Sequence, residues 1–160
     1  MSGKIEAETP EDRLARMGLV LPPVPPAAGN YVGYVLAGPL LFVSGQLSRK
    51  ADGNLITGRA GADLTLAQAQ DAARASALNI LAQAKSAFGT LSRVSRVVRL
   101  NGFVQSSADF KDHAQVMNGA SDLIASVLGP AGIHTRVAAG AHALPLNAAT
   151  EIDAMIAGLP

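Results

Sequence analysis

The residues from Thr65 to Gly89 constrain the fold most, because they combine a helical repeat with an apolar face made largely of alanine. Thr65 and Gln68, three residues later, form a capping box, and Gly89 is a typical C-terminal stop. This pattern predicts a helix whose small side chains let it lie close against a flat partner such as a sheet. Its apolar stripe consists of Leu66, Ala69, Ala73, Ala77, Ile80, Leu81, Ala84 and Phe88.

Strand patterns precede this helix. Residues Tyr31–Leu47 contain two β-rich runs separated by Ala37-Gly38-Pro39, which is typical of a hairpin. We expect the second run to end at Ser44-Gly45. The polar, glycine-rich residues 48–64 are expected to form an exposed loop.

A third strand, a second helix and two more strands follow. Val94–Gln105 is β-branched and partly alternating, which indicates a strand. A helix is predicted from about Asp109 to Leu128, where Gly129-Pro130 ends it. The apolar stretch Ile133–Ala157 predicts two strands that turn at Leu144-Pro145-Leu146-Asn147.

The order of these elements predicts an α+β domain, with two helices on one face of a mixed β-sheet. The other face is then uncovered. We expect it to carry Val43, Val98, Leu100 and the Val137–Ala143 run, which is apolar enough to predict that several copies of the chain associate.

The N-terminal part has a different character. Thr9-Pro10-Glu11-Asp12 combines a cap residue, a proline at the first helical position and first-turn acids, and Gly18 can stop the short helix that follows. Residues 21–30 hold four prolines and are expected to run extended. We therefore divide the chain into residues 1–28, a helical appendage and proline-rich strap, and residues 29–160, a single domain.

Composition excludes several classes of function. The chain has 160 residues, 49% of them hydrophobic, which suffices for a real core. A net charge of +1 does not indicate a basic surface for binding nucleic acid or an anionic membrane. Without cysteine there are no disulfides and no thiolate sites. No segment has signal-peptide character or 18 consecutive apolar residues, so we expect a soluble, cytoplasmic protein.

Motifs for common chemistries are missing from the sequence. GxGxxG, Walker-type, HExxH and GxSxG patterns do not occur. The three histidines, His113, His134 and His142, show no metal-ligand spacing, so no metal site is expected. His134 stands two residues before Arg136, where it could line a pocket or simply be capped.

Arg136 is the most informative polar residue, because it lies in an otherwise apolar strand. A buried guanidinium needs an anionic partner. That partner is either Glu151, in a structural ion pair, or the carboxylate of a ligand. Glu151 could equally act as a general base, and Asp153 shares its face by strand alternation.

Simple hairpin geometry limits the ion-pair hypothesis. If the two strands turn symmetrically about Pro145-Leu146, Arg136 faces Met155. Glu151 then lies four positions away, about 13 Å along the strand. A bulge, a shifted turn or a bridging ligand would be needed, so both interpretations of Arg136 stay open.

Five stretches resemble the Rid/YjgF family, whose members are reactive-intermediate (enamine/imine) deaminases. The resemblance covers about residues 28–157, and the arginine, Leu-Pro and final acidic pair fall in one ungapped register. The stretches are GNYV (29–32), LFVSGQL (41–47), the helix that starts TLAQAQDAARASALNILAQAK, VMNGASDL (116–123) and TRVAAGAHALPLNAATEID (135–153).

The resemblance implies a chorismate-mutase-like subunit and a homotrimer with ligand sites at the subunit clefts. By position, Arg136 matches the arginine that grips the substrate carboxylate, Glu151 the acid that positions water, and Tyr31 a tyrosine near the pocket mouth. Residues at positions that line the cleft are Ser44, Asn118 and Ala138, the last where many members have a cysteine.

The implied reaction is hydrolysis of 2-imino acids, formed from 2-aminoacrylate-type enamines, to 2-oxo acids and ammonia, with no metal or cofactor. One alternative is a regulatory trimer that binds small carboxylates such as 2-oxo acids without turnover. Another is the RNA cleavage ascribed to some relatives, which the near-neutral charge and few aromatic residues disfavour.

Overall fold

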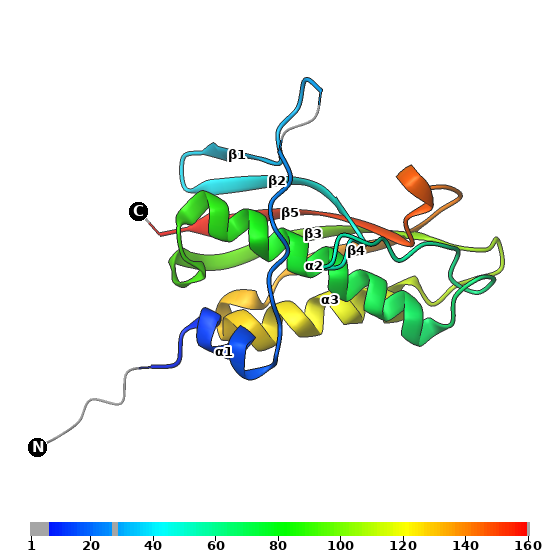
Figure 1. Cartoon of the computed structure of the whole chain (residues 1–160), viewed down its shortest axis with the longest axis horizontal. Coiled ribbons are helices and arrows are strands. Elements are labelled where there is room, and N and C mark those ends of the chain that lie inside the picture. The colour runs from blue at the N-terminus through cyan, green and yellow to red at the C-terminus, as the bar shows by residue number, and fades with distance from the viewer. Residues whose placement is uncertain (1–6, 27–28, 160) are drawn as a thin grey trace, which may run out of the picture.

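A single mixed sheet in the strand order β1-β2-β5-β3-β4 forms the centre of the molecule, and two long helices cover one of its faces (Figure 1). The computed structural model describes residues 7–26 and 29–159. The strands are β1 (Tyr34–Ala37), β2 (Leu40–Leu47), β3 (Val94–Gln105), β4 (Thr135–Ala141) and β5 (Thr150–Gly158). The helices are α1 (Pro10–Arg16), α2 (Leu66–Phe88) and α3 (His113–Leu128), with short 3₁₀ turns at Leu91–Arg93, Gly129–Gly132 and Pro145–Asn147. The predicted α+β class, with two helices on one face, is confirmed.

Helix α2 forms as the sequence predicts. Thr65 accepts a hydrogen bond from the backbone N–H of Gln68, whose side chain accepts from the backbone of Thr65. Gly89 ends the helix in the left-handed conformation. The alanines of the apolar stripe are fully buried, so α2 packs closely on β2 and β5.

Helix α3 begins at His113, four residues later than predicted. The preceding residues form a turn, closed by a hydrogen bond from the backbone N–H of Phe110 to the carbonyl of Ser107. Phe110 packs against the core from this turn rather than from the helix. Because Phe110 is apolar and fits the helical spacing, the sequence pattern predicts too early a start for the helix.

The predicted hairpin of the last two strands is wrong. Strand β4 pairs in parallel with β3, and β5 pairs antiparallel with both β3 and β2. Strand β3 therefore lies between them, and α3 provides the crossover connection that parallel neighbours require. Consecutive strands are neighbours only about two-thirds of the time, and the turn residues alone do not reveal the exception.

The prediction that the second strand ends at Ser44-Gly45 is wrong. One extra residue forms a bulge there, because Val43 pairs with Ala154 while Gln46 pairs with Ile152. The strand continues to Leu47 beyond the bulge. By contrast, the predicted turn at Gly38-Pro39 is present, and Gly38 has a φ of 60° there.

The face of the sheet that α2 and α3 leave open is apolar, but its residues differ from those expected. Val43 and Leu100 are buried and face the helices. The open face instead carries Phe42 and Phe103, which are 41% and 39% exposed, together with Val137, which was expected there and is 41% exposed. Alternation along β2 and β3 shows which residues share a face but not which of the two faces the helices cover.

The N-terminal residues pack on the domain. Glu11 accepts hydrogen bonds from the backbone of Leu91 and the hydroxyl of Thr90, and Arg13 donates to the carbonyl of Val127. Figure 1 shows the segment after α1 crossing over α2 toward β1. Residues 1–6 and 27–28 of the predicted appendage and strap lie outside the described residues, so the boundary at residue 28 stays a prediction. Within the described residues, no helix is long and apolar enough to span a bilayer.

Candidate functional site

Arg136 lies on β4, one of the two edge strands of the sheet, and its side chain points toward α3. Its Nη1 donates to Ser121 Oγ at 2.9 Å. Its Nη2 donates to the carbonyl of Ala114 at 3.0 Å and to Asn118 Oδ1 at 2.9 Å. These partners are neutral, and no carboxylate of the described residues lies within ion-pair distance. The half-buried guanidinium is held in place while its charge stays uncompensated.

A shallow hollow of about 280 Å³ adjoins Arg136 and includes His134, Ser121 and Asp122. His134 Nε2 lies 2.9 Å from Ser121 Oγ, and its Nδ1 lies 2.6 Å from the carbonyl oxygen of Gly132. His134 precedes β4 rather than belonging to it. The sequence left open whether His134 lines a pocket or is capped by a hydrogen bond. The structure shows both, because the histidine is hydrogen bonded and also lines the hollow.

Glu151 lies on the open face of the sheet, next to Asp153. Burial, and then the negative charge of Asp153, raise the pKa of Glu151 above its usual value. Asp153 accepts a hydrogen bond from Asn101 at 2.7 Å. A side chain at Gly45, in the β2 bulge, would overlap with the Glu151 carboxylate, so the bulge leaves room for this group.

Arg136 and Glu151 do not meet within one chain, which overturns the hypothesis of a structural ion pair. Leu100 of β3 pairs with Arg136, whereas Phe103 of β3 pairs with Glu151. Positions 100 and 103 differ by an odd number, so the two side chains point to opposite faces. They also lie two strands apart, about 10 Å across the sheet.

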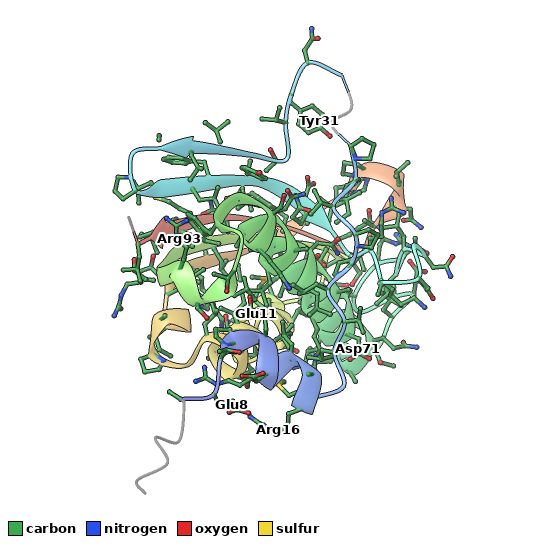
Figure 2. The ribbon with its side chains drawn as sticks, turned by 60° about the vertical axis from the view of Figure 1, so that its left-hand side comes forward. Glu8, Glu11, Arg16, Tyr31, Asp71 and Arg93 are labelled. Carbon is green, nitrogen blue, oxygen red and sulfur yellow. The ribbon has the colours of Figure 1, made fainter. Side chains whose placement is uncertain are left out.

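Tyr31 and Ser44 lie together at a pocket next to the β2 bulge. A pocket of about 400 Å³ is lined by both residues and by Gly45, between the strap, the loop before β1 and α2. Ser44 Oγ donates to the carbonyl of Val32 at 2.6 Å. Tyr31 is 66% exposed, and Figure 2 shows it on the loop that projects beyond the sheet.

The candidate residues therefore form two separate groups. Arg136, Asn118 and Ala138 belong to β4 and α3, where Ala138 packs against the core rather than opening into a cavity. Tyr31, Ser44 and Glu151 surround the β2 bulge. We refer to these groups as the two halves of the candidate site, although one chain does not bring them together.

Sequence reasoning missed two contributors to the arginine half. The carbonyl of Ala114 and the side chain of Ser121 both hold Arg136, and His134, which the sequence had singled out, holds Ser121. Ala114, Asn118 and Ser121 are spaced by four and three residues, so they share one face of α3. That spacing was a usable signal once Asn118 had been singled out.

No group of three or more metal-ligating side chains occurs within the described residues. His113, the other histidine with a side-chain partner, lies 3.1 Å from Ser106 Oγ and packs edge-on against Phe110. Nothing in this second pair connects it to either half of the candidate site.

Comparisons with known proteins agree with the fold. The family described as "YjgF/chorismate mutase-like, putative endoribonuclease" matches residues 11–157. Protein TCP17 of Trypanosoma cruzi is 47% identical over 156 residues, which cover 97% of this chain and 94% of that protein.

Two crystal structures are also similar to the whole chain. Atu1372 from Agrobacterium tumefaciens, a protein of unknown function, has 47% identity and a TM-score of 0.87, with 94% of each chain covered. A protein from Shewanella oneidensis that bears the same endoribonuclease description has 37% identity and a TM-score of 0.89, covering 93% of this chain and 99% of that one.

Proposed function

The chain belongs to the YjgF/chorismate mutase-like family, and from this premise we propose that it hydrolyses 2-imino acids to 2-oxo acids and ammonia. The substrates are the imines that form from reactive enamines of the 2-aminoacrylate type. Such imines are already electrophilic, so positioning and a held water suffice to accelerate their hydrolysis.

The uncompensated charge of Arg136 is the observation that carries this proposal. A guanidinium has five N–H donors, and three of those of Arg136 are taken by Ser121, Ala114 and Asn118. The remaining two, Nε–H and one proton of Nη1, have no partner among the described residues. Because the partners within the chain are neutral, a ligand carboxylate supplies the missing negative charge.

Glu151 supplies the acid–base chemistry in this proposal. Its raised pKa makes the carboxylate a better proton acceptor than an ordinary glutamate. Water attacks the imine carbon: a C–O bond forms, the C=N π electrons move to the nitrogen, and one water proton passes to Glu151, which delivers it to that nitrogen. The remaining hydroxyl proton is then transferred to the nitrogen through the same carboxylate, the C–N bond breaks, ammonia leaves, and the C–O bond becomes the carbonyl of the oxo acid.

The two halves of the site come from two copies of the chain in this proposal. Arg136 on the edge strand of one copy meets Glu151 on the open face of the next, because within one chain they point to opposite faces. The apolar residues of the open face support such an assembly, since they otherwise remain exposed. A homotrimer, which the family resemblance implies, gives three equivalent clefts.

A complementation experiment tests this arrangement. Imines are generated in situ by an amino-acid oxidase, and release of the 2-oxo acid is followed. Arg136→Ala and Glu151→Gln should each lose most of the acceleration. When the two variants are unfolded and refolded together in equal amounts, random trimers should regain about a quarter of the wild-type sites, since each site needs one intact residue from each neighbour.

The control is His142→Asn, which changes an exposed residue outside both halves of the site and should keep full activity. If the mixture shows no gain over the separate variants, the two-copy site is wrong. If Arg136→Ala is as active as the wild type, the arginine has no part in the reaction.

The same preparation separates the alternative functions. A regulatory trimer without turnover predicts that 2-oxo acids bind in an Arg136-dependent manner while the lifetime of the imine is unchanged. An endoribonuclease, as the family description suggests, predicts RNA cleavage that stays with the protein through repeated purification and is lost in Glu151→Gln or Arg136→Ala.

A further inference from the structure

We propose that His134 is a positioning residue, which orients the carboxylate-binding Arg136 through the hydroxyl of Ser121. The inference rests on the proposed function, because it assigns a role within the arginine half of that site. Four groups form one continuous chain of hydrogen bonds: the carbonyl of Gly132, the imidazole of His134, the hydroxyl of Ser121 and the guanidinium of Arg136.

The direction of each hydrogen bond follows from the ends of this chain. The carbonyl oxygen of Gly132 can only accept, so Nδ1 of His134, at 2.6 Å, carries a proton and donates it. Arg136 can only donate, so Ser121 Oγ accepts from Nη1 at 2.9 Å. The hydroxyl proton of Ser121 is then free to point at His134 Nε2, 2.9 Å away.

This arrangement selects one state of the histidine, the neutral tautomer with its proton on Nδ1. In that state every donor in the chain faces an acceptor, and a lone pair of Ser121 points at Arg136. A proton on Nε2 would instead make His134 and Arg136 both donate to the hydroxyl of Ser121, whose own proton would then lose His134 as its acceptor. The charged groups around this hollow are Arg136, on β4, and Asp122, on α3.

Ser121 is the partner that holds Nη1, whereas Ala114 and Asn118 both hold Nη2. Without the Ser121 contact, Nη1 is no longer held, and the guanidinium can turn about Nη2, which stays bound to Ala114 and Asn118. The two donors left for a ligand would then no longer be fixed in direction, and the site would bind carboxylates less tightly.

The first test is a direct measurement of the tautomer. Nitrogen-15 spectra of the labelled imidazole in the whole protein should show a protonated Nδ1 and a hydrogen-bonded, unprotonated Nε2 at neutral pH. A protonated Nε2 on a neutral ring contradicts the derived chain and overturns the inference. This readout is independent of any enzymatic activity.

The second test compares two substitutions of the histidine with pyruvate as the ligand. His134→Asn keeps a donor for Gly132 but has no acceptor at the place of Nε2, and should weaken pyruvate binding about tenfold, the effect of losing one hydrogen bond to a charged group. His134→Gln places an amide oxygen near the position of Nε2 and should restore most of the affinity. His142→Asn is the matched control and should bind like the wild type.

A double-mutant cycle identifies the route. Ser121→Ala should weaken binding as much as His134→Asn, and the double variant should be no worse, because both changes cut the same chain. In the imine assay, the KM should rise while kcat changes little. A purely structural role would lower the thermal stability of His134→Asn without this rise in KM.

The outcomes distinguish this inference from the proposed function. If the wild type binds pyruvate and His134→Asn binds it equally well, the positioning role is wrong and the proposed function stands. If the wild type neither binds pyruvate nor accelerates imine hydrolysis, the proposed function fails first, and the role of His134 fails with it.

Discussion

At the scale of single residues, Glu151 links the chemistry of the site to the stability of the protein. Its folded-state pKa lies above the ordinary value of 4.5, because burial and Asp153 disfavour its charged form. The folded protein therefore binds this proton more tightly than the unfolded chain. The resulting stabilisation is fully present below pH 4.5 and is lost as the pH rises through the raised pKa.

Replacing Glu151 by glutamine removes this pH-dependent loss. Glu151→Gln should be more stable than the wild type at pH 7, by less than about 1 kcal/mol because solvent screens a half-exposed group. The difference should vanish as the pH falls below 4.5. Urea unfolding at several pH values measures it.

Asp153→Asn provides the matched control for this effect. It removes the second cause of the shift and should lower the pKa of Glu151, as followed by carbon-13 NMR of its carboxyl group. A stability difference between Glu151→Gln and the wild type that is the same at every pH would contradict the assignment.

At the scale of secondary structure, the β2 bulge lies between Glu151 and the pocket that Tyr31 and Ser44 line. A side chain at Gly45 would overlap with the carboxylate of Glu151. Gly45→Ala should therefore destabilise the protein only modestly, by less than about 1 kcal/mol, because the group that must shift is the end of a flexible, partly exposed side chain. It should also displace Glu151 and reduce imine hydrolysis.

A second substitution makes this prediction specific. In the background of Glu151→Ala the overlapping carboxylate is gone, so Gly45→Ala should cost much less. The free energies of unfolding of the four proteins give the coupling between the two positions. Additive effects would show that the cost of Gly45→Ala comes from the backbone of the bulge and not from Glu151.

The elements differ in how well their sequence predicts them. Helix α2 forms within the predicted limits, because its cap, its stripe and its stop are all local signals. Strand β3 likewise has the predicted limits. The partners of β4 and β5 could not be predicted in this way, since pairing depends on residues 36 to 64 positions away in β3 and on the crossover through α3.

The candidate site shows the same division. Asn118 and Arg136 are brought together as the family resemblance implies. The separation of Arg136 from Glu151 depends on strand order, which the turn residues do not reveal, and on which face each residue occupies, which a one-residue shift in register reverses. The interaction of Ser121 with His134 needed coordinates, because a serine in a helix and a histidine before a strand carry no pattern that links them.

At the scale of the whole molecule, we expect the open face of the sheet to mediate the proposed assembly. Phe42→Glu places a charge on this face and should dissociate the oligomer into single chains, as measured by sedimentation velocity at micromolar concentration. Imine hydrolysis should fall with it, because each proposed site needs two copies.

Val20→Glu is the control for the assembly, since Val20 is exposed on the segment after α1 and not on the sheet. It should leave the oligomer and the activity intact. A wild-type protein that sediments as a single chain and still hydrolyses imines would contradict a site shared between copies.

The position of β5 has a consequence for how the chain is made. Strands β1 and β2 form one pair and β3 and β4 another, and residues 150–158 lie between them. During synthesis both pairs, and the helices that rest on them, leave the ribosome before the strand that connects them. Until then β2 and β3 each present an unpaired edge, so the nascent chain is exposed to mispairing until β5 inserts between them.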